Sequence, residues 1–333
     1  MKRFFPVILT LMLILTLAIT GCGGSKRVGP GDDPGGTFSI AESLVAAAAS
    51  FPTGTDDSGP GGTVTYPYYM AKYEVTYALW KEVYDWAQSH GYEINEGTCG
   101  GTFMTDGTGR DSDPVTWINW YDAVVWCNAL TEYYNEKNHA NLVCVYQDAA
   151  DNVIRNSKDS TVQAYLDGLD SMAAVDSSAK GFRLPTGMEW ELAARYIGPD
   201  QPTVEPLRSA AIPMGGLYWT PGTYASGATS YCDLTHIYDS DAQAATMAAA
   251  WYGWNSESST HPAGQKPANG NALCLYDMSG NVWEWCFETN GANRVCRGGG
   301  WDNMVGSMQI GIPNGYTPDY TYSDLGLRPV RTQ

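Results

Sequence analysis

The feature that most restricts the fold of this chain is the composition of its second half. Beyond Arg195 the sequence is dense in Gly, Pro, Tyr, Trp and Asn, and it has no convincing helical periodicity. Gly, Pro and Asn favour turns, and the aromatic residues between them favour short strands. This part of the chain is therefore predicted to form short strands and long ordered loops, without helices.

Helices are expected only in the first half of the chain. A strand is predicted over 66–74, where aromatic and apolar residues alternate with polar ones. Thr76 can cap a helix that follows this strand and runs to about Ser89. A second helix is expected over about 121–134, because its apolar residues share one face at helical spacing.

A third helix has the clearest N-terminal signal. Thr186 and Glu189 have the spacing of a capping box, and Pro185 prevents an earlier start. Between the second and third helices, residues from about 138 to 180 have weak periodicity and many Asp and Ser residues. We interpret this stretch as an insertion on the surface of the domain.

The N-terminus has the layout of an export signal. Two basic residues precede an apolar run over 7–19, which is shorter than the roughly 20 residues that a bilayer crossing needs. Residues 1–21 are therefore predicted to be a signal peptide. The Ile-Thr-Gly sequence directly before Cys22 resembles a bacterial lipobox, so Cys22 is predicted to carry lipid.

This anchor divides the mature chain into a tether and a domain. Residues 22–40 contain mainly Gly, Pro, Asp and Ser after Cys22 and are expected to form a flexible tether. Residues 41–333 then form the folded part. We expect an exported protein, held at a bacterial outer membrane or cell surface by acyl chains.

The charge of the chain limits its partners. The net charge is −17, and loss of Lys2 and Arg3 with the signal peptide makes it −19, with 36 acidic groups against 17 basic ones. Nucleic acid is excluded as a partner, because such binding needs Lys and Arg to neutralise phosphates. The acidity fits carboxylate-rich cation sites, and equally a soluble acidic surface.

The cysteines point to neither a zinc site nor a thioredoxin-like motif, because no C-x-x-C pair is present. An oxidising compartment allows disulfides, and the odd number of cysteines besides Cys22 leaves at least one thiol free. These seven are Cys99, Cys127, Cys144, Cys232, Cys274, Cys286 and Cys296.

Several short motifs follow one another in a fixed order. In the first half they are Tyr73-Glu74-Val75-Thr76, Pro114-Val115, Trp120-Tyr121-Asp122-Ala123, Cys127-Asn128, Gly181-Phe182-Arg183-Leu184-Pro185-Thr186, Glu189-Trp190-Glu191 and Ala193-Ala194-Arg195. In the second half they are Leu275-Tyr276-Asp277-Met278-Ser279-Gly280-Asn281-Val282-Trp283-Glu284-Trp285, Arg297-Gly298-Gly299-Gly300-Trp301 and Gly326-Leu327-Arg328.

This order resembles the formylglycine-generating enzyme family, also called the sulfatase-modifying factor family. The resemblance covers the chain from about residue 50 to the end. It implies an α+β fold of the C-type-lectin-like class, in the subgroup of formylglycine-generating enzymes, with long loops and little regular secondary structure.

A calcium site is predicted in the segment around Gly280. Asp277 and Glu284 could supply two carboxylate ligands, and the carbonyl groups of Gly280 and Val282 could supply others, a mixture that suits calcium. The family resemblance implies the same four positions. The alternative is that these groups only hydrogen-bond a turn.

The catalytic cysteines of the family are missing. Formylglycine-generating enzymes use two cysteines that bind copper, and their positions fall on Asn303 and Met308, neither of which can provide a thiolate. Cys296 lies on the wrong side of the glycine block. The related iron-dependent sulfoxide synthases use histidine-rich sites, whereas the four histidines here are far apart in sequence. We therefore expect no copper, no iron and no catalysis.

The segment 301–328 differs in character from the rest of the chain. It is rich in Tyr, Ser, Gly and Asn, which are typical of binding loops because Tyr adds contact area at low entropic cost. An ordinary aromatic-rich loop would have a similar composition. A domain of this family that ends in this way resembles the variable proteins of diversity-generating retroelements.

In those systems an error-prone reverse transcriptase rewrites the adenines of chosen codons. An AAC template codon can then yield Asn, Tyr, Asp, Ser, Gly, Ile, Val or Pro, but not Met, Trp or Gln. Trp301, Met304, Met308 and Gln309 are therefore expected to be fixed. The expected variable, ligand-binding positions are Asn303, Val305, Gly306, Ile312, Asn314, Gly315, Tyr316, Asp319, Tyr320 and Tyr322.

These observations give one hypothesis and two alternatives. The hypothesis is a lipid-anchored, non-catalytic display protein, monomeric, whose diversified C-terminal region binds an unknown protein or glycan. The first alternative is a metal- and oxygen-dependent enzyme of the same family. The second is a structural envelope lipoprotein.

Overall fold

The computed structural model describes residues 38–58, 61–102, 109–170, 179–232, 239–266 and 272–333. The helices are α1 (Tyr77–Gln88), α2 (Trp120–Asn138), α3 (Ser160–Asp167), α4 (Gly187–Arg195), α5 (Leu207–Ala210), α6 (Ser240–Ala249) and a 3₁₀ helix, η3 (Val305–Met308). The strands are β1 (Glu42–Val45), β2 (Ala48–Phe51), β3 (Gly62–Val64), β4 (Tyr68–Ala71), β5 (Thr98–Cys99), β6 (Val115–Thr116), β7 (Tyr196–Gly198), β8 (Ile212–Met214), β9 (Leu217–Trp219), β10 (Trp283–Asn290), β11 (Asn293–Arg297), β12 (Asn314–Tyr316), β13 (Leu325–Gly326) and β14 (Val330–Thr332).

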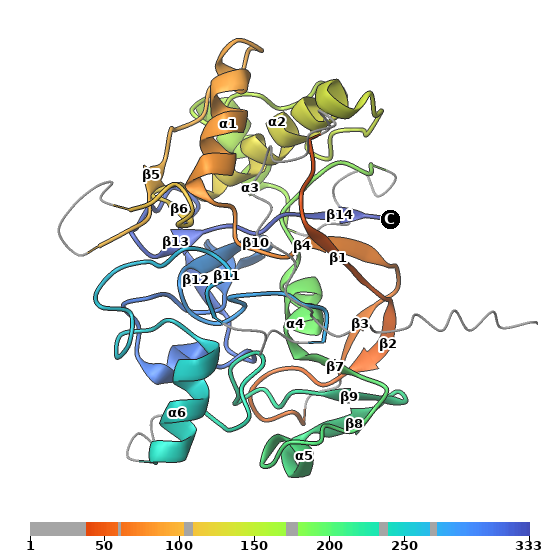
Figure 1. The fold of residues 1–333 in the computed structure, drawn as a ribbon. Coiled ribbons are helices and arrows are strands. Elements are labelled where there is room, and N and C mark those ends of the chain that lie inside the picture. Colours follow the sequence, from red (N-terminus) through yellow and green to blue (C-terminus); the bar gives the residue numbers. More distant parts are fainter. Residues whose placement is uncertain (1–37, 59–60, 103–108, 171–178, 233–238, 267–271) are drawn as a thin grey trace, which may run out of the picture.

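The centre of the domain is a four-stranded sheet with the order β12-β11-β10-β13 (Figure 1). Successive side chains of β10 point to opposite faces of the sheet, and those of its first five residues are buried on both faces. Trp285 and Phe287 pack into the core cluster that contains α1 and α2, whereas Cys286 packs into the cluster that contains α4. The sheet therefore separates two hydrophobic layers.

The helices predicted in the first half are present. Thr76 caps α1 by accepting a hydrogen bond from the Leu79 backbone N–H at 3.3 Å, and the helix ends at Ser89. The predicted strand before it is confirmed as β4, and the second helix, α2, is longer than expected. In α4 the capping box forms as predicted, with Thr186 and Glu189 each bonded to the other's backbone N–H.

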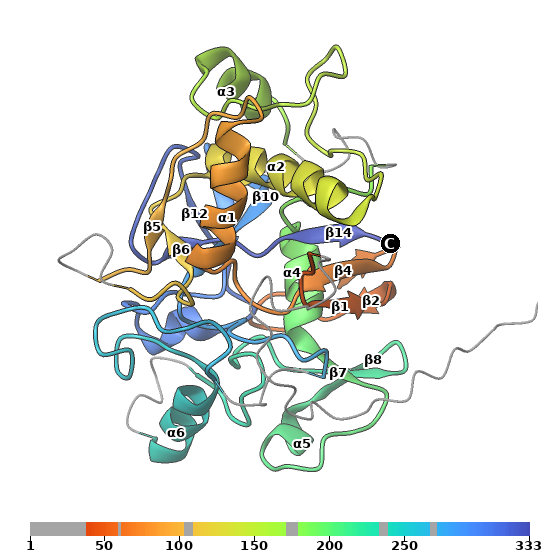
Figure 2. The ribbon, with the colours of Figure 1, turned by 45° about the horizontal axis from the view of Figure 1, so that its top comes forward.

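The two ends of the described chain meet in a second sheet, of order β1-β4-β14. Both β1 and β14 pair antiparallel with β4, so the first and last strands of the domain share one neighbour. Figure 2 shows this sheet beside α4, on the side away from α6. Closure of the chain at this sheet leaves the loops before β13 at the opposite side of the molecule.

Two expectations about local structure are wrong. Helices α5 and α6 form in the second half, where no helix is predicted; half of the residues of α6 are Ala, which favours helix without giving an amphipathic pattern. The segment 138–180 is not confined to the surface, since Tyr146, Ile154 and Leu166 are buried in the core and α3 forms within it. Local periodicity reveals neither feature, because the alanines of α6 give no apolar stripe and the burial of 138–180 depends on tertiary packing.

The ordered domain begins slightly before the predicted boundary. Phe38 is buried and packs edge-on against Tyr133 of α2, with ring centroids 4.9 Å apart. The predicted signal peptide and Cys22 lie outside the described residues. Within the described part of the chain, no helix is long and apolar enough to cross a membrane.

Candidate functional site

Trp301 fixes both ends of the loop that precedes β13. Its side chain is fully buried, and its indole N–H donates to the Ser323 carbonyl at 2.9 Å. Its backbone N–H donates to the Asn281 carbonyl at 2.8 Å. The residues between Trp301 and Ser323 therefore form a loop whose two ends are held together by one side chain.

The first part of this loop is anchored from within. Met308 is fully buried in a small core cluster with Val305 and residues of α6, and Figures 1 and 2 both show α6 beside η3. Gln309 is buried and donates to the Cys232 carbonyl at 2.7 Å. These contacts hold the backbone while neighbouring side chains face outward.

A shallow depression of about 610 Å³ lies over this anchored part, and we call it the loop depression. Met304, at its edge, is 69% exposed. Trp254, which is 50% exposed, comes from a neighbouring segment that joins the loop through a hydrogen bond from Gly253 N–H to the Asn303 carbonyl, 2.9 Å long. The depression is lined by Asp302, Asn303, Met304, Gly306, Ser307, Gln309 and Ile312.

The later part of the loop carries a row of stacked tyrosines, the tyrosine row. Tyr316 and Tyr320 stack with ring centroids 4.6 Å apart, and Tyr320 and Tyr322 stack at 6.0 Å. Tyr322 also contacts Trp117, whose backbone N–H donates to the Tyr322 carbonyl. Tyr320 is 36% exposed. The row is thus partly accessible, with Tyr320 exposed and Tyr316 and Tyr322 half-buried on either side of it.

A pair of carboxyl groups joins the loop depression to the tyrosine row. Asp324 is buried next to Asp302, which lines the depression. Burial, followed by the adjacent Asp302, raises the pKa of Asp324 to about 8. Burial, followed by Tyr322 and then by the two carboxyl groups, raises the pKa of Tyr320. The depression and the tyrosine row therefore form one continuous surface with acid at its centre.

Most of the predicted ligand-binding positions lie on this surface. Asn303, Gly306 and Ile312 line the loop depression, and Tyr316, Tyr320 and Tyr322 form the tyrosine row. Asn314 and Gly315 are half-buried in β12, and Asp319 is exposed.

One of the individual expectations for this loop needs correction. Val305 is buried against Met308, so its side chain contributes to the core and not to the surface. Met304 has the most exposed of the large apolar side chains in this loop, and the expectation that its codon is fixed stays a prediction. Trp301, Met308 and Gln309 are buried, as scaffold residues would be.

Glu284 of the predicted calcium segment has an arginine against it. The guanidinium of Arg328 donates to both carboxylate oxygens of Glu284, at 2.7–3.0 Å, and the Trp190 indole N–H donates to Oε2 at 2.7 Å. Arg328 is itself fully buried and also donates to the Ala71 and Tyr276 carbonyls. Glu284 is therefore satisfied by protein donors and does not fit the role of a calcium ligand in this arrangement.

Asp277 has a different environment. One of its oxygens, Oδ2, accepts from the Gly264 backbone N–H, whereas Oδ1 is buried without a hydrogen-bond partner. Burial raises the pKa of Asp277 to about 6. Glu74 lies nearby, and burial together with Asp277 and Glu284 raises its pKa well above the usual range. Among the described residues, no group of three or more acidic, His or Cys side chains is placed to hold a metal ion, so calcium binding through Asp277, Gly280 and Val282 stays a prediction.

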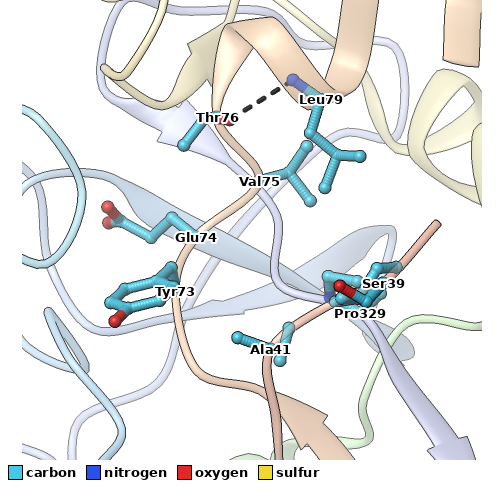
Figure 3. Close-up of a pocket in the computed structure, with 10 residues that line it drawn as sticks. Ser39, Ala41, Tyr73, Glu74, Val75, Thr76, Leu79 and Pro329 are labelled. Carbon is cyan, nitrogen blue, oxygen red and sulfur yellow. Dashed lines mark hydrogen bonds between the residues drawn. The ribbon is translucent and has the colours of Figure 1, made fainter. Parts of the chain in front are cut away.

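A crevice between β4, α1 and the start of the domain is too small to be the site. Its volume of about 70 Å³ is far below the 610 Å³ of the loop depression and the roughly 300–1,000 Å³ of small-molecule sites. Figure 3 shows Tyr73 and Glu74 pointing to one side of the chain, while Val75 and Leu79 point to the other. The Glu74 carboxylate accepts a hydrogen bond from the Asn281 side-chain amide at 2.7 Å, so it helps to hold the predicted calcium segment in place.

The positions that the family resemblance assigns to the catalytic cysteines lie in the same loop. Asn303 accepts from the Gly300 backbone N–H at 2.9 Å and closes the turn after the glycine block, while Met308 packs into the core. Cys296 and Cys286 are buried on opposite faces of the central sheet, and burial raises the pKa of both thiols well above the usual range. Neither is poised as a thiolate.

The comparisons with known proteins agree with the order of motifs. The sulfatase-modifying factor enzyme 1-like domain model matches residues 34–333. The chain belongs to this family. Members of the sulfatase-modifying factor family share the α+β, C-type-lectin-like architecture described above, so the predicted fold is confirmed.

Three relatives are similar over nearly their whole length. The chaperone protein LppX of Paenibacillus barcinonensis is 26% identical over 335 residues, which are 97% of this chain and 99% of that protein. The crystal structure of CarF is 26% identical, with a TM-score of 0.62 over 89% of this chain and 99% of CarF. Treponema denticola variable protein 1 is 25% identical, with a TM-score of 0.53 over 88% and 95% of the two chains.

Sequence reasoning about this member of the sulfatase-modifying factor family missed Asp302, Asp324 and Trp254. A signal for the first two is present, since 298–327 contains three aspartates and no Lys or Arg. Their pairing could not be seen, because it depends on the loop closed by Trp301. Trp254 is distant in sequence and has no motif around it.

Proposed function

We propose that this chain is an exported lipoprotein that binds a ligand through the loop depression and the tyrosine row. The observation that carries the proposal is the loop closed by Trp301, in which buried anchors support outward-facing side chains. Such a loop can change its surface without changing its backbone. A preorganised surface binds well because little ordering entropy is lost on binding.

Diversification of this surface is supported by the likeness to Treponema denticola variable protein 1. It is also supported by the division of the loop into buried and accessible positions. Of the four positions whose codons cannot arise from a rewritten AAC, Trp301, Met308 and Gln309 are buried and Met304 is the exposed exception, whereas Asn303, Gly306 and the tyrosines are accessible. A retroelement that rewrites only the second group would preserve the fold.

A binding role is favoured over catalysis because the thiolates for the copper chemistry of the family are not at their expected positions. That chemistry needs two thiolates, and Asn303 and Met308 stand at their positions. The nearest cysteine in sequence, Cys296, is buried with a raised pKa. The enzymatic alternative would therefore need a new set of metal ligands.

The ligand proposed here is a protein, with a glycan as the competing class. A protein ligand fits the name of the Paenibacillus relative, which is described as a chaperone. The anchor is proposed to be lipid on Cys22, with the domain acting as a monomer. The acidic net charge of −17 argues against nucleic acid.

The first test is to sequence the gene and its flanking DNA from several isolates. We expect differences to concentrate in the codons for accessible positions within 303–322, opposite adenines of a nearby template repeat, with Trp301, Val305 and Met308 constant. Differences spread evenly over the gene, with no template, would contradict diversification and favour a structural envelope lipoprotein.

The anchor is tested separately by growth with an alkyne-labelled fatty acid. We expect label on the wild-type chain and none on the Cys22→Ser variant. The matched control is Cys99→Ser, which should keep the label. Label on Cys22→Ser would contradict lipidation at this position.

A further inference from the structure

Among the residues that the structure describes, no basic group is paired with the acid at the centre of the proposed binding surface. No Lys or Arg occurs between residues 298 and 327. Arg297 and Arg328, which flank this stretch, are buried and bonded to Glu191 and Glu284. The titratable groups close to Asp324 are Asp302, Tyr316, Tyr320 and Cys296, and none of them carries a positive charge.

Asp324 has few hydrogen-bond partners. Its side chain is 2% exposed, and its Oδ1 is buried and accepts no hydrogen bond from an N–H or hydroxyl donor in the described structure. Its other contacts are the adjacent Asp302 carboxyl group, to which it is hydrogen-bonded, and the Asn303 amide, which donates to Asp324 Oδ2 at 3.5 Å and to Asp302 Oδ1 at 2.9 Å. Gly300 lies directly beneath, where a Cβ would stand 2.5 Å from Oδ2, so the backbone leaves room for the carboxyl group. A buried carboxyl group with an unused acceptor favours an incoming donor.

Asp302, the more accessible carboxyl group of this pair, lines the loop depression, and Asp324 lies buried next to it. Other parts of the depression are apolar, with Met304 and Ile312. An amphipathic side chain with an apolar stem and a cationic head matches this arrangement of apolar and acidic residues. Lys and Arg place their stems on apolar surface and their charge on polar groups. Arginine fits better than lysine, because its planar fork can serve two carboxyl groups at once.

We infer that the ligand recognised by this surface inserts a basic side chain, arginine foremost, into the loop depression and against the Asp302 and Asp324 carboxyl groups. The inference rests on the proposed binding function and adds the chemistry of the partner: a protein with an accessible basic residue. The partner's guanidinium supplies the positive charge that the loop lacks. Tyr320, beside both carboxyl groups, borders the site.

The test titrates the purified chain with acetyl-arginine amide and follows the methyl signal of Met304 by NMR. Acetyl-citrulline amide, which has nearly the same shape without the charge, is the matched probe. We expect saturable binding of the arginine probe only. Asp302→Asn and Asp324→Asn should each weaken it by about tenfold or more, because a charge-assisted hydrogen bond is lost. Asp200→Asn, an exposed change of the same net charge, should not.

The pH dependence provides a second measurement that a folding defect would not reproduce. Asp324 ionises with a pKa of about 8, so the arginine probe should bind more tightly at pH 9 than at pH 6. In Asp324→Asn this difference should shrink. Equal binding of both probes, no binding of either, or equal affinity in all three variants would overturn the inference.

A calcium chloride titration tests the alternative that a divalent cation occupies the site. A Met304 shift with calcium but not with the arginine probe would replace the inferred side chain with a divalent cation. The result is independent of the proposed diversification, which stands or falls on the gene sequences from the isolates.

Discussion

Glu284 and Asp324 are both almost fully buried, yet only Glu284 has a cation against it. Glu284 lies in the framework between β10 and Arg328 and accepts four hydrogen bonds from Arg328 and Trp190. Asp324 lies at the binding surface and has another carboxyl group as its neighbour. The framework satisfies its buried acid internally, whereas the proposed site leaves its acid for a ligand to satisfy.

The largest effect should come from breaking the framework pair. In Arg328→Met we expect the free energy of unfolding to fall by about 3–5 kcal/mol, because Glu284 would be left buried without its partner. Urea unfolding followed by circular dichroism measures this change. Arg208→Met removes an exposed arginine that faces Glu205 at 3.9 Å and should cost less than about 0.5 kcal/mol. Equal losses in the two variants would remove the contrast on which the comparison depends.

The next prediction tests whether the cost comes from the unpaired charge. Glu284→Gln combined with Arg328→Met should be less destabilising than Arg328→Met alone, by roughly 1–3 kcal/mol, because no buried charge is left unpaired. The same unfolding experiment measures it. If the two losses simply add, Glu284 and Arg328 do not act as a pair.

Removal of the Asp324 carboxyl group should stabilise the protein, by an amount that depends on pH. Its pKa is near 4 in the unfolded chain and about 8 in the folded protein, so between these values the folded state holds a proton that the unfolded state has lost. The contribution of this group to stability is therefore complete below pH 4 and is lost as the pH rises to about 8. We expect Asp324→Asn to gain on the wild type over this window, by roughly 1–3 kcal/mol at pH 9, in thermal unfolding measured from pH 4 to 9. A difference that does not depend on pH would show that Asp324 ionises normally.

The smallest effect is expected from calcium. Because Arg328 already neutralises Glu284, we expect the melting temperature to be the same in calcium and in EDTA. A clear rise with calcium would show that Asp277 and the nearby carbonyl groups bind the ion without Glu284, since a ligand that binds only the folded state stabilises it. Asp277→Ala should then abolish that rise.

The sequence predicts what depends on neighbours along the chain. Thr76, Thr186 and Glu189 cap their helices through contacts within three residues, and the family motifs predict the fold. It does not predict contacts that depend on distant segments. Glu284 meets Arg328 across 44 residues, and Asp302 meets Asp324 only because the intervening loop returns. Helix α6 was missed because its alanines carry propensity without periodicity.

The Trp301 indole has a consequence for how this loop can evolve. By bonding Ser323, it closes the residues between them into a ring, and buried contacts of Met308 and Gln309 hold that ring to the rest of the domain. The entropic cost of closing that ring is offset by a contact outside the accessible positions. This cost is therefore the same whatever side chains those positions carry. Substitutions on the surface can therefore be selected for binding alone, while the stability of the fold is set elsewhere.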